Sequence, residues 1–256
     1  MSSGYFVWHE LFTTDVAAAI AFYGEVFGWK TQAFSGASEP YTMFCVGEQP
    51  IGGVMLLPEL AKANGAPPHW LGHVEVQDLA ATLAKVADLG GQVLHQETVP
   101  TVGKIAITRD PQGAALSCFQ PEQSMPLTHP TAGRVSWNEL NTRDWEAAFA
   151  YYSALFGWTE HARFEMGPEL GAYFLYQVPG APFPLGGMSG SAKVHGFPPH
   201  WLYYVEVEDM DAAVGRVRAS GGKVLLEMDV PGGKIASCQD PQGVAFAMHQ
   251  QVGERG

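Results

Sequence analysis

The sequence predicts an α+β protein made of four βαβββ modules that pair two by two. Two internal repeats support this prediction. "WHELFTTD" at residues 8–15 returns as "WNELNTRD" at 137–144, "PPHWLGHVEVQD" returns as "PPHWLYYVEVED", and "DPQG" occurs twice. Within each half, a fainter repeat joins a short strand ending at an aspartate, a helix of three turns and three short β-rich runs.

The first quarter contains the first predicted helix. Asp15 is its expected N-cap, because an aspartate side chain accepts hydrogen bonds from the first turn, and Gly28 its left-handed C-terminal cap. Four residues at 3.6-residue spacing are predicted to form its apolar face: Val16, Ile20, Tyr23 and Phe27.

The second quarter repeats the plan after "HVEVQ". Asp78 is predicted to cap a helix that ends at Gly90 and Gly91, and its apolar face is expected to hold Leu79, Leu83, Val86 and Leu89. Strands are expected at 92–97, 104–108 and 114–119, with "DPQG" as the hairpin turn between the last two. The third and fourth quarters follow the same order.

Two domains follow from this repeat. Modules at about 5–60 and 67–120 form a predicted first domain of residues 1–120. Modules at about 134–192 and 197–250 form a second domain of residues 134–252. Between them, residues 121–133 are rich in Pro, Ser and Thr and lack periodicity, as expected of a linker.

Composition narrows the function classes. Of 256 residues 46% are hydrophobic, which is enough for one large core or two ordinary domains. No window approaches the roughly 20 apolar residues of a membrane span and no signal sequence opens the chain, so we expect a cytoplasmic protein. A formal charge of −12 disfavours nucleic acid and anionic membranes as partners. The three cysteines have no CxxC spacing, so we expect buried thiols.

The helix pattern "D…AxxFYxxxFGW", the unit "HVEVQDLAATLAKVADLGG" and the "DPQG" hairpin together resemble the vicinal oxygen chelate superfamily, the group of glyoxalases, bleomycin-resistance proteins and extradiol dioxygenases. Four modules in this order are most similar to bacterial two-domain glyoxalase-like proteins. The resemblance implies that paired modules curl into incomplete barrels with helices outside and a ligand cleft inside. Isomerases, dioxygenases, transferases and non-catalytic binding proteins share this scaffold.

The resemblance also implies where a metal would be bound. Metal-dependent members place a His on the first strand of each module and a Glu on the last strand. The matching positions here are Trp8, Leu71, Ser117, Trp137, Leu202 and Ala247. None of these residues is a good ligand for a divalent ion, so we predict no metal and no cofactor.

Strand alternation assigns the faces. If Val74 and Val76 face the helix layer, then His73 and Glu75 face the cleft, and Tyr204 and Glu206 do the same in the fourth module. With Leu11 and Leu140 in the core, the concave side receives Trp8, Glu10, Phe12, Trp137, Glu139 and Asn141. A slip of one residue would bring His9 and His249 into consideration, but the alternation argues against it.

These residues form two candidate pockets. Trp8, Glu10, Phe12, His73 and Glu75 suit a ligand with a cationic or hydrogen-bond-donating group held against flat apolar walls. The same set contains metal-ligand types, and in a purely structural interpretation Glu10 and Glu75 bind backbone groups or an arginine.

The second pocket, made of Trp137, Glu139, Asn141, Tyr204 and Glu206, replaces His by Tyr and Phe by Asn. The two clefts are therefore not expected to recognise the same molecule. Packed structural clefts stay an alternative for both.

Other conspicuous residues have structural interpretations. His69 and His200, in the repeated "PPHW", are expected to cap a loop or stack on a neighbouring ring. Lys104 and Lys234, in "GKIA", are expected to be solvated edge lysines, and the "DPQG" aspartates to form turns.

No nucleophile motif, P-loop or dinucleotide fingerprint is present. We therefore expect a metal-free small-molecule binding protein, monomeric or homodimeric. The alternatives are a lyase, isomerase or oxygenase acting on a small carbonyl or polyketide-like substrate, and a duplicated interaction scaffold.

Overall fold

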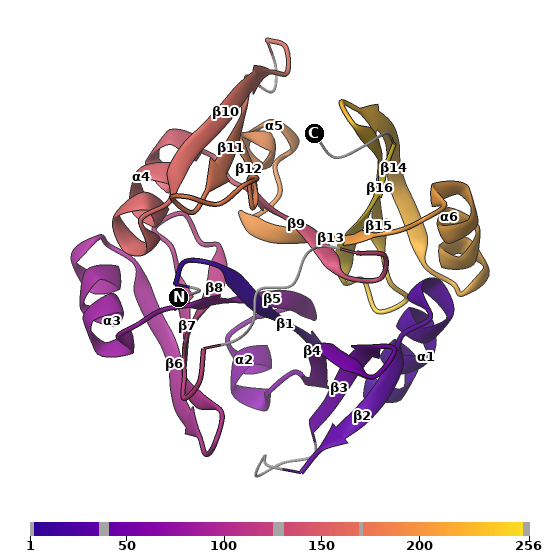
Figure 1. The fold of residues 1–256 in the computed structure, drawn as a ribbon, viewed down its shortest axis with the longest axis horizontal. Coiled ribbons are helices and arrows are strands. Elements are labelled where there is room, and N and C mark those ends of the chain that lie inside the picture. The colour runs from indigo at the N-terminus through magenta and orange to yellow at the C-terminus, as the bar shows by residue number, and fades with distance from the viewer. Residues whose placement is uncertain (1–2, 36–40, 125–130, 169–170, 253–256) are drawn as a thin grey trace. The chain divides into compact units, whose positions relative to one another are not determined.

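The computed structural model describes residues 3–35, 41–124, 131–168 and 171–252, and it has the predicted α+β class (Figure 1). Four βαβββ modules follow one another along the chain, as predicted. Two short helices, which were not predicted, form the last elements of the first and third modules.

The first half of the chain contains two modules. The first module comprises, in order, β1 (Phe6–Thr13), α1 (Val16–Phe27), β2 (Lys30–Phe34), β3 (Tyr41–Val46), β4 (Gln49–Leu56) and the short α2 (Glu59–Ala63). The second comprises β5 (His69–Glu75), α3 (Leu79–Asp88), β6 (Gln92–Val99), β7 (Gly103–Arg109) and β8 (Ala115–Pro121).

The second half repeats this order. The third module comprises β9 (Val135–Asn141), α4 (Trp145–Phe156), β10 (Thr159–Glu165), β11 (Ala172–Gln177), β12 (Gly186–Ser189) and the short α5 (Ser191–His195). The fourth comprises β13 (His200–Glu206), α6 (Met210–Ala219), β14 (Lys223–Val230), β15 (Gly233–Gln239) and β16 (Ala245–Gln251).

The strands form two open, mixed sheets of eight strands each within the described residues. Their orders are β2-β3-β4-β1-β5-β8-β7-β6 and β10-β11-β12-β9-β13-β16-β15-β14. Within each module the first strand runs parallel to the last, and the other paired strands of that module are antiparallel. The two sheets therefore have the same topology, as the sequence repeat requires.

Contacts between Cα atoms divide the chain into two compact units. One holds Met1–Trp8, Leu71–Thr128 and Trp137–Trp201, and the other holds His9–Trp70, His129–Ser136 and Leu202–Gly256. In Figure 1, α3 lies beside α4 and α1 beside α6, in agreement with these units. The predicted domains, 1–120 and 134–252, stay a prediction, and residues 125–130 of the predicted linker lie outside the described residues.

The caps of α1 are confirmed. Asp15 Oδ1 accepts a hydrogen bond from the Ala18 amide at 2.9 Å, and Gly28 has a left-handed conformation with φ 71°. The fully buried face is turned slightly from the prediction, because it centres on Ala19, Phe22, Tyr23 and Val26. Of the predicted face only Tyr23 lies at this centre, while Val16, Ile20 and Phe27 pack at its margin.

Helix α3 also begins as predicted, with Asp78 accepting from the Ala81 amide at 3.0 Å. Leu79 and Val86 are buried and Leu83 packs beside them. The assignment of Leu89 to the apolar face was wrong, because it is the C-cap residue and its side chain is 37% exposed.

Each "DPQG" turn binds the helix that carries the "FGW" motif. Asp110 Oδ1 accepts from the amides of Gln112, Gly113 and Ala114, and Oδ2 accepts from the Tyr152 hydroxyl at 3.0 Å. The Trp201 indole N–H donates to the same hydroxyl at 3.3 Å. The aspartate therefore forms the turn, as predicted, and also anchors α4.

The other unit repeats this arrangement with Asp240, Tyr23 and Trp70. The Tyr23 hydroxyl donates to Asp240 Oδ2 at 3.3 Å and accepts from the Trp70 indole at 3.0 Å. We call each of these groups a Trp–Tyr–Asp chain. The three cysteines, at 45, 118 and 238, are buried and free, as predicted. Within the described residues, no helix combines the length and the apolar character of a membrane span.

Candidate functional site

The core positions on which the strand register depended are buried. Leu11, Leu140 and Val74 are 0% exposed, and Val76 packs against α3. Residues directly opposite each other on two paired strands point to the same side of a sheet. Each module therefore presents a group of side chains opposite its core face, on the side that we call the concave side.

The third module has the most connected of these groups. The Trp137 indole N–H donates to the Tyr173 hydroxyl at 2.8 Å, and that hydroxyl donates to Glu139 Oε2 at 2.7 Å. Asn141 Nδ2 donates to Glu139 Oε1 at 3.1 Å, and the Ser191 hydroxyl donates to Asn141 Oδ1. The three predicted residues of this module are thus joined in one network, in which each partner fixes the orientation of the next.

Tyr173, on β11, was not predicted as a site residue. Its ring lies over Gly187 of β12, and a β-carbon on Gly187 would overlap the ring. Because Gly187 pairs with Glu139, the ring crosses the sheet at the level of that carboxylate. The repeated Gly-Gly pair at 186–187 was the available signal, since glycine within a strand often marks a close approach.

The first module keeps part of this frame. Gly53 pairs with Glu10, and a β-carbon on Gly53 would overlap the Tyr41 hydroxyl. Glu10 is 9% exposed and Phe12 is 5% exposed, and Trp8 is half-buried. The position beside Phe12 is held by Met55, where the third module has Ser189 beside Asn141. The first module is therefore the more apolar of the two.

His69 and His200 have the structural role that was predicted. His69 Nδ1 lies 2.7 Å from the Pro67 carbonyl oxygen, and its ring is 5.4 Å from that of Phe12. Burial lowers the pKa of His69, although the Pro67 hydrogen bond and the Glu10 charge act in the opposite direction. His200 Nδ1 lies 3.0 Å from the Pro198 carbonyl oxygen.

The second module buries both of its predicted residues. His73 is 4% exposed and makes an edge contact with the ring of Phe119, with centroids 6.4 Å apart. Glu75 is 6% exposed and accepts a hydrogen bond from the Ser124 hydroxyl at 2.6 Å. A serine hydroxyl is thus one partner of this carboxylate.

The fourth module contains a carboxylate and imidazole pair. Glu206 Oε2 lies 3.0 Å from His249 Nδ1, and the two residues are opposite each other on β13 and β16. Burial acts to raise the pKa of Glu206, but hydrogen bonding and attraction from His249, with smaller contributions from Ser136 and the Gln251 amide, lower it overall. Tyr204 is 6% exposed.

The exclusion of His249 was wrong. It was thought to require a slip in register, yet it lies two residues after Ala247 and therefore on the same face. His9, in contrast, packs edge-on against Tyr203 with centroids 4.8 Å apart.

The residues at the implied metal positions do not fit a divalent ion. Ser117 lies opposite His73 and Ala247 lies opposite Tyr204, so the last-strand position carries no carboxylate. The first-strand positions carry indole or leucine side chains, which offer no strong donor. In the described ranges, no group of three or more His, Cys, Asp or Glu side chains is placed to hold a metal. We derive no chemical step through a metal.

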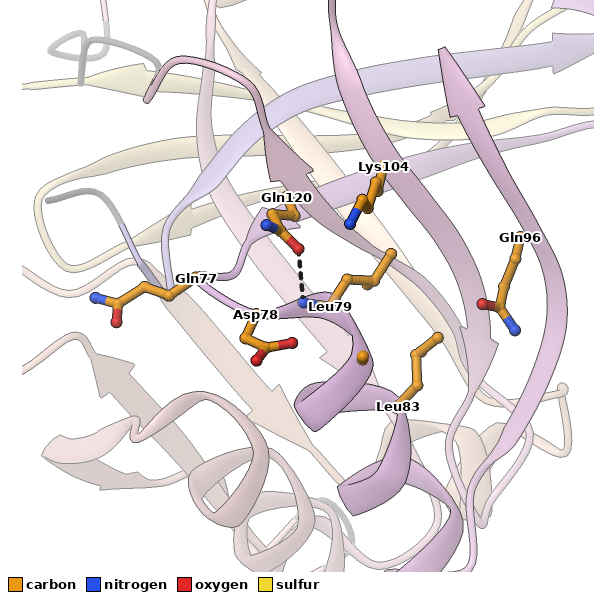
Figure 2. Close-up of a pocket in the computed structure, with 8 residues that line it drawn as sticks. Gln77, Asp78, Leu79, Leu83, Gln96, Lys104 and Gln120 are labelled. Atoms are coloured by element: carbon orange, nitrogen blue, oxygen red, sulfur yellow. Dashed lines mark hydrogen bonds between the residues drawn. The ribbon is translucent and has the colours of Figure 1, made fainter. Parts of the chain in front are cut away.

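An open hollow of about 340 Å³ lies away from these groups, at the N-terminus of α3 (Figure 2). Leu79, Leu83 and Lys104 line it, and Gln120 Oε1 accepts a hydrogen bond from the Leu79 amide at 2.9 Å. Lys104 is exposed, as predicted, but β7 lies between β6 and β8 and is not an edge strand, so that part of the prediction was wrong. None of the predicted pocket residues lines this hollow.

Comparisons with known proteins agree with the repeat. The sequence model of the Glyoxalase/Bleomycin resistance protein/Dioxygenase superfamily matches residues 5–117 and 132–248. The protein called "Putative glyoxylase CFP32" in Mycobacterium bovis is 32% identical over 247 residues, 94% of this chain and 92% of that protein. "Anthracycline biosynthesis protein DauV" of Streptomyces sp. strain C5 is 28% identical over 256 residues, 94% of this chain and 91% of that protein.

Solved structures support the fold. The 2,3-dioxygenase LapB from Pseudomonas sp. KL28 matches with a TM-score of 0.65 and 12% identity, over 100% of this chain and 96% of that one. The Mn(II)-bound glyoxalase from Novosphingobium aromaticivorans matches with a TM-score of 0.64 and 13% identity, over 99% and 83%. At such identities the likeness concerns architecture alone.

Proposed function

Because the chain belongs to the glyoxalase, bleomycin resistance protein and dioxygenase superfamily, we propose that it is a small-molecule binding protein that holds its ligand on the concave strands without a metal ion. The third module carries the proposal. In the other modules the proposed contacts are Trp8, Glu10, Phe12, His73, Glu75, Tyr204 and Glu206.

The observation that most supports this function is the chain of two hydrogen bonds from Trp137 through Tyr173 to Glu139. It holds two aromatic rings and a carboxylate in fixed positions before any ligand arrives, so little side-chain entropy is lost on binding. The absence of a side chain at Gly187 allows the Tyr173 ring to lie there.

The chemistry of the network indicates the ligand class. Indole and phenol rings favour a flat aromatic ligand, and the carboxylate favours a hydrogen-bond-donating or cationic group on it. The name of the Streptomyces relative, an anthracycline biosynthesis protein, supports an aromatic polyketide of this kind.

Calorimetric titration with doxorubicin, an anthracycline with an amino group, tests the proposal. We expect the wild-type protein to bind and Glu139→Gln to weaken binding about tenfold or more, since hydrogen bonds to a charged group contribute about 1.5–3 kcal/mol. Glu165→Gln is the matched control, because Glu165 is exposed on β10 of the same module. Absence of wild-type binding, or equal affinity in the two variants, would refute this function.

The metal-free part has its own test. Dialysis against EDTA should leave the dissociation constant unchanged, because the residues at the implied metal positions offer no strong donors. If EDTA abolished binding and Mn²⁺ restored it, that part of the proposal would be wrong.

A second candidate is an enzyme on the same strands. The word glyoxylase in the name of the mycobacterial relative favours it, and so does the Tyr173 proton shared with Glu139, since such a pair suits acid–base catalysis. Incubation with methylglyoxal, with and without a thiol, followed by NMR, tests it. A product that Glu139→Gln does not form would replace the binding function by this one.

A further inference from the structure

The Glu206 and His249 pair has the geometry of an oriented base. The carboxylate is 8% exposed and the imidazole 25% exposed, and Glu206 Oε2 lies 3.0 Å from His249 Nδ1. When neutral His249 donates its Nδ1 proton to this carboxylate, Nε2 becomes the acceptor. The buried partner thus sets the tautomer, and the more exposed partner carries the reactive nitrogen.

Further contacts hold the carboxylate in place. The Gln251 amide donates to Glu206 Oε1 at 3.3 Å, and Ser136 also contributes a hydrogen bond to the carboxylate. Within the described residues, Glu206 is the charged group opposite His249 on the neighbouring strand β13, while Lys234 of β15 pairs with Gln250 and lies on the other side of the sheet. A proton gained by the imidazole would therefore meet a fixed negative charge.

The backbone leaves room for the imidazole. A β-carbon on Gly233 would lie 2.1 Å from the Gln250 carbonyl oxygen and 3.0 Å from His249 Nε2. The close approach of the Gln250 backbone accounts for the glycine, which also leaves that nitrogen clear of a side chain. Gly233 has no positive φ, so its backbone conformation does not require glycine. Glycine is required here because a side chain would not fit.

In the second module, a phenylalanine takes the place of the imidazole in this pair. There Glu75 lies opposite Phe119, and Gly103 stands beside the ring as Gly233 stands beside the imidazole. The same scaffold thus accepts either an imidazole or a benzyl side chain at this place. His249 is an addition to the fourth module that folding alone does not require.

We propose that Glu206 and His249 form a proton-transfer site for a ligand with a weakly acidic hydroxyl group, such as a phenol. The ligand O–H bond breaks, its proton bonds to His249 Nε2, and the electron pair stays on the ligand oxygen as a phenolate. Glu206 is the positioning residue, which stabilises the imidazolium. The proton returns when the ligand leaves, so no other reactant is needed.

This site shares Glu206 with the proposed contacts of the fourth module, but it uses no residue of the third-module network, so its test can fail or succeed separately from that of the proposed function. It transfers a proton from the ligand, a step that binding alone does not need. The lowered pKa of Glu206 agrees with it, since a carboxylate that stays charged stabilises an imidazolium beside it.

Absorbance titration with 4-nitrophenol tests the site, because the phenolate of this probe absorbs visible light. We expect the bound probe to ionise about tenfold more readily than the free probe, the effect of one opposite charge nearby. His249→Phe should abolish this shift while leaving the fold intact, since it recreates the Glu75 and Phe119 combination. His161→Phe, at an exposed position of β10, should keep it.

Glu206→Gln separates positioning from mere packing. A positioning role predicts that the bound probe ionises at higher pH than in the wild-type protein, whereas a structural role predicts weaker binding with an unshifted profile. The proposal is overturned if that profile is unshifted, if His249→Phe ionises the probe as the wild type does, or if wild-type protein does not shift the probe.

Discussion

The first and third modules share an arrangement of a glutamate, a glycine and a tyrosine, and they differ in the residues beside the glutamate. Both place a glycine opposite a glutamate, Gly53 at Glu10 and Gly187 at Glu139, and in both a tyrosine lies over that glycine. Beside the glutamate, however, the first module pairs Phe12 with Met55 and the third pairs Asn141 with Ser189.

This difference separates scaffold from specificity. The duplicated elements are those that fold the chain: capped helices, glycine pairs and the Trp–Tyr–Asp chains. The divergent positions lie on the concave side, where the first module has an apolar pair at the positions that hold a polar pair in the third module. The shared part is therefore expected to govern stability, and the divergent part ligand choice.

The largest effect is expected from breaking a shared element. Tyr152→Phe removes the hydroxyl that joins Trp201 to Asp110 and leaves both groups buried without it. We expect a loss of about 2–3 kcal/mol in the free energy of unfolding, the usual cost of orphaned buried polar groups. Urea denaturation measures it.

The adjacent residue supplies the control. The Tyr151 hydroxyl is buried and makes no hydrogen bond within the part of the chain that the structure describes. Tyr151→Phe should therefore be neutral or slightly stabilising, because nothing is orphaned. If both variants lost the same stability, the Trp–Tyr–Asp chain would not be the element that holds α4.

A smaller loss of stability is expected from a change at Gly187, which belongs to the shared scaffold and also contacts the binding residue Tyr173. Gly187→Ala places a β-carbon against the Tyr173 ring and must displace it from Glu139. We expect a loss of about 1–2 kcal/mol from overpacking, together with weaker doxorubicin binding. Gly215→Ala, in α6, is the control, because its β-carbon meets nothing within 4 Å. Unchanged binding in Gly187→Ala would show that Tyr173 takes no part in the site.

Much of the fold was predictable because its signals are local or repeated. Asp15, Gly28 and Asp78 act on backbone groups within a few residues, so their roles can be inferred from short segments. Leu11 and Val74 fixed the strand faces through simple alternation. The doubling of each signal along the chain then fixed the order of the modules.

The site was less predictable because it depends on distant partners. Tyr173 reaches Glu139 through the pairing of three strands, and the glycine pair at 186–187 signals a close approach without telling which side chain makes it. The partner of Tyr23 is Asp240, 217 residues away. The prediction that excluded His249 failed for a simpler reason, because the side of the strand on which His249 lies was misjudged.

The smallest effect concerns the one position at which the two "FGW" helices differ by a glycine. "FYGEVFGW" has Gly24 in the interior of α1, where "YYSALFGW" has Ser153 in α4. The nearest atom to a β-carbon on Gly24 is the Trp29 carbonyl oxygen at 3.5 Å, which is ordinary contact.

Gly24→Ala is therefore expected to add about 0.5–1 kcal/mol to the free energy of unfolding, because alanine restricts the unfolded chain and glycine is a poor helix former. Thermal melting of the variant should show a higher midpoint. Ser153→Ala is the counterpart: the Ser153 hydroxyl is buried without a hydrogen bond in the described chain, so its removal should cost nothing. A lower midpoint for Gly24→Ala would mean that α1 needs this glycine for a close approach, and that the two helices are not equivalent parts of the scaffold.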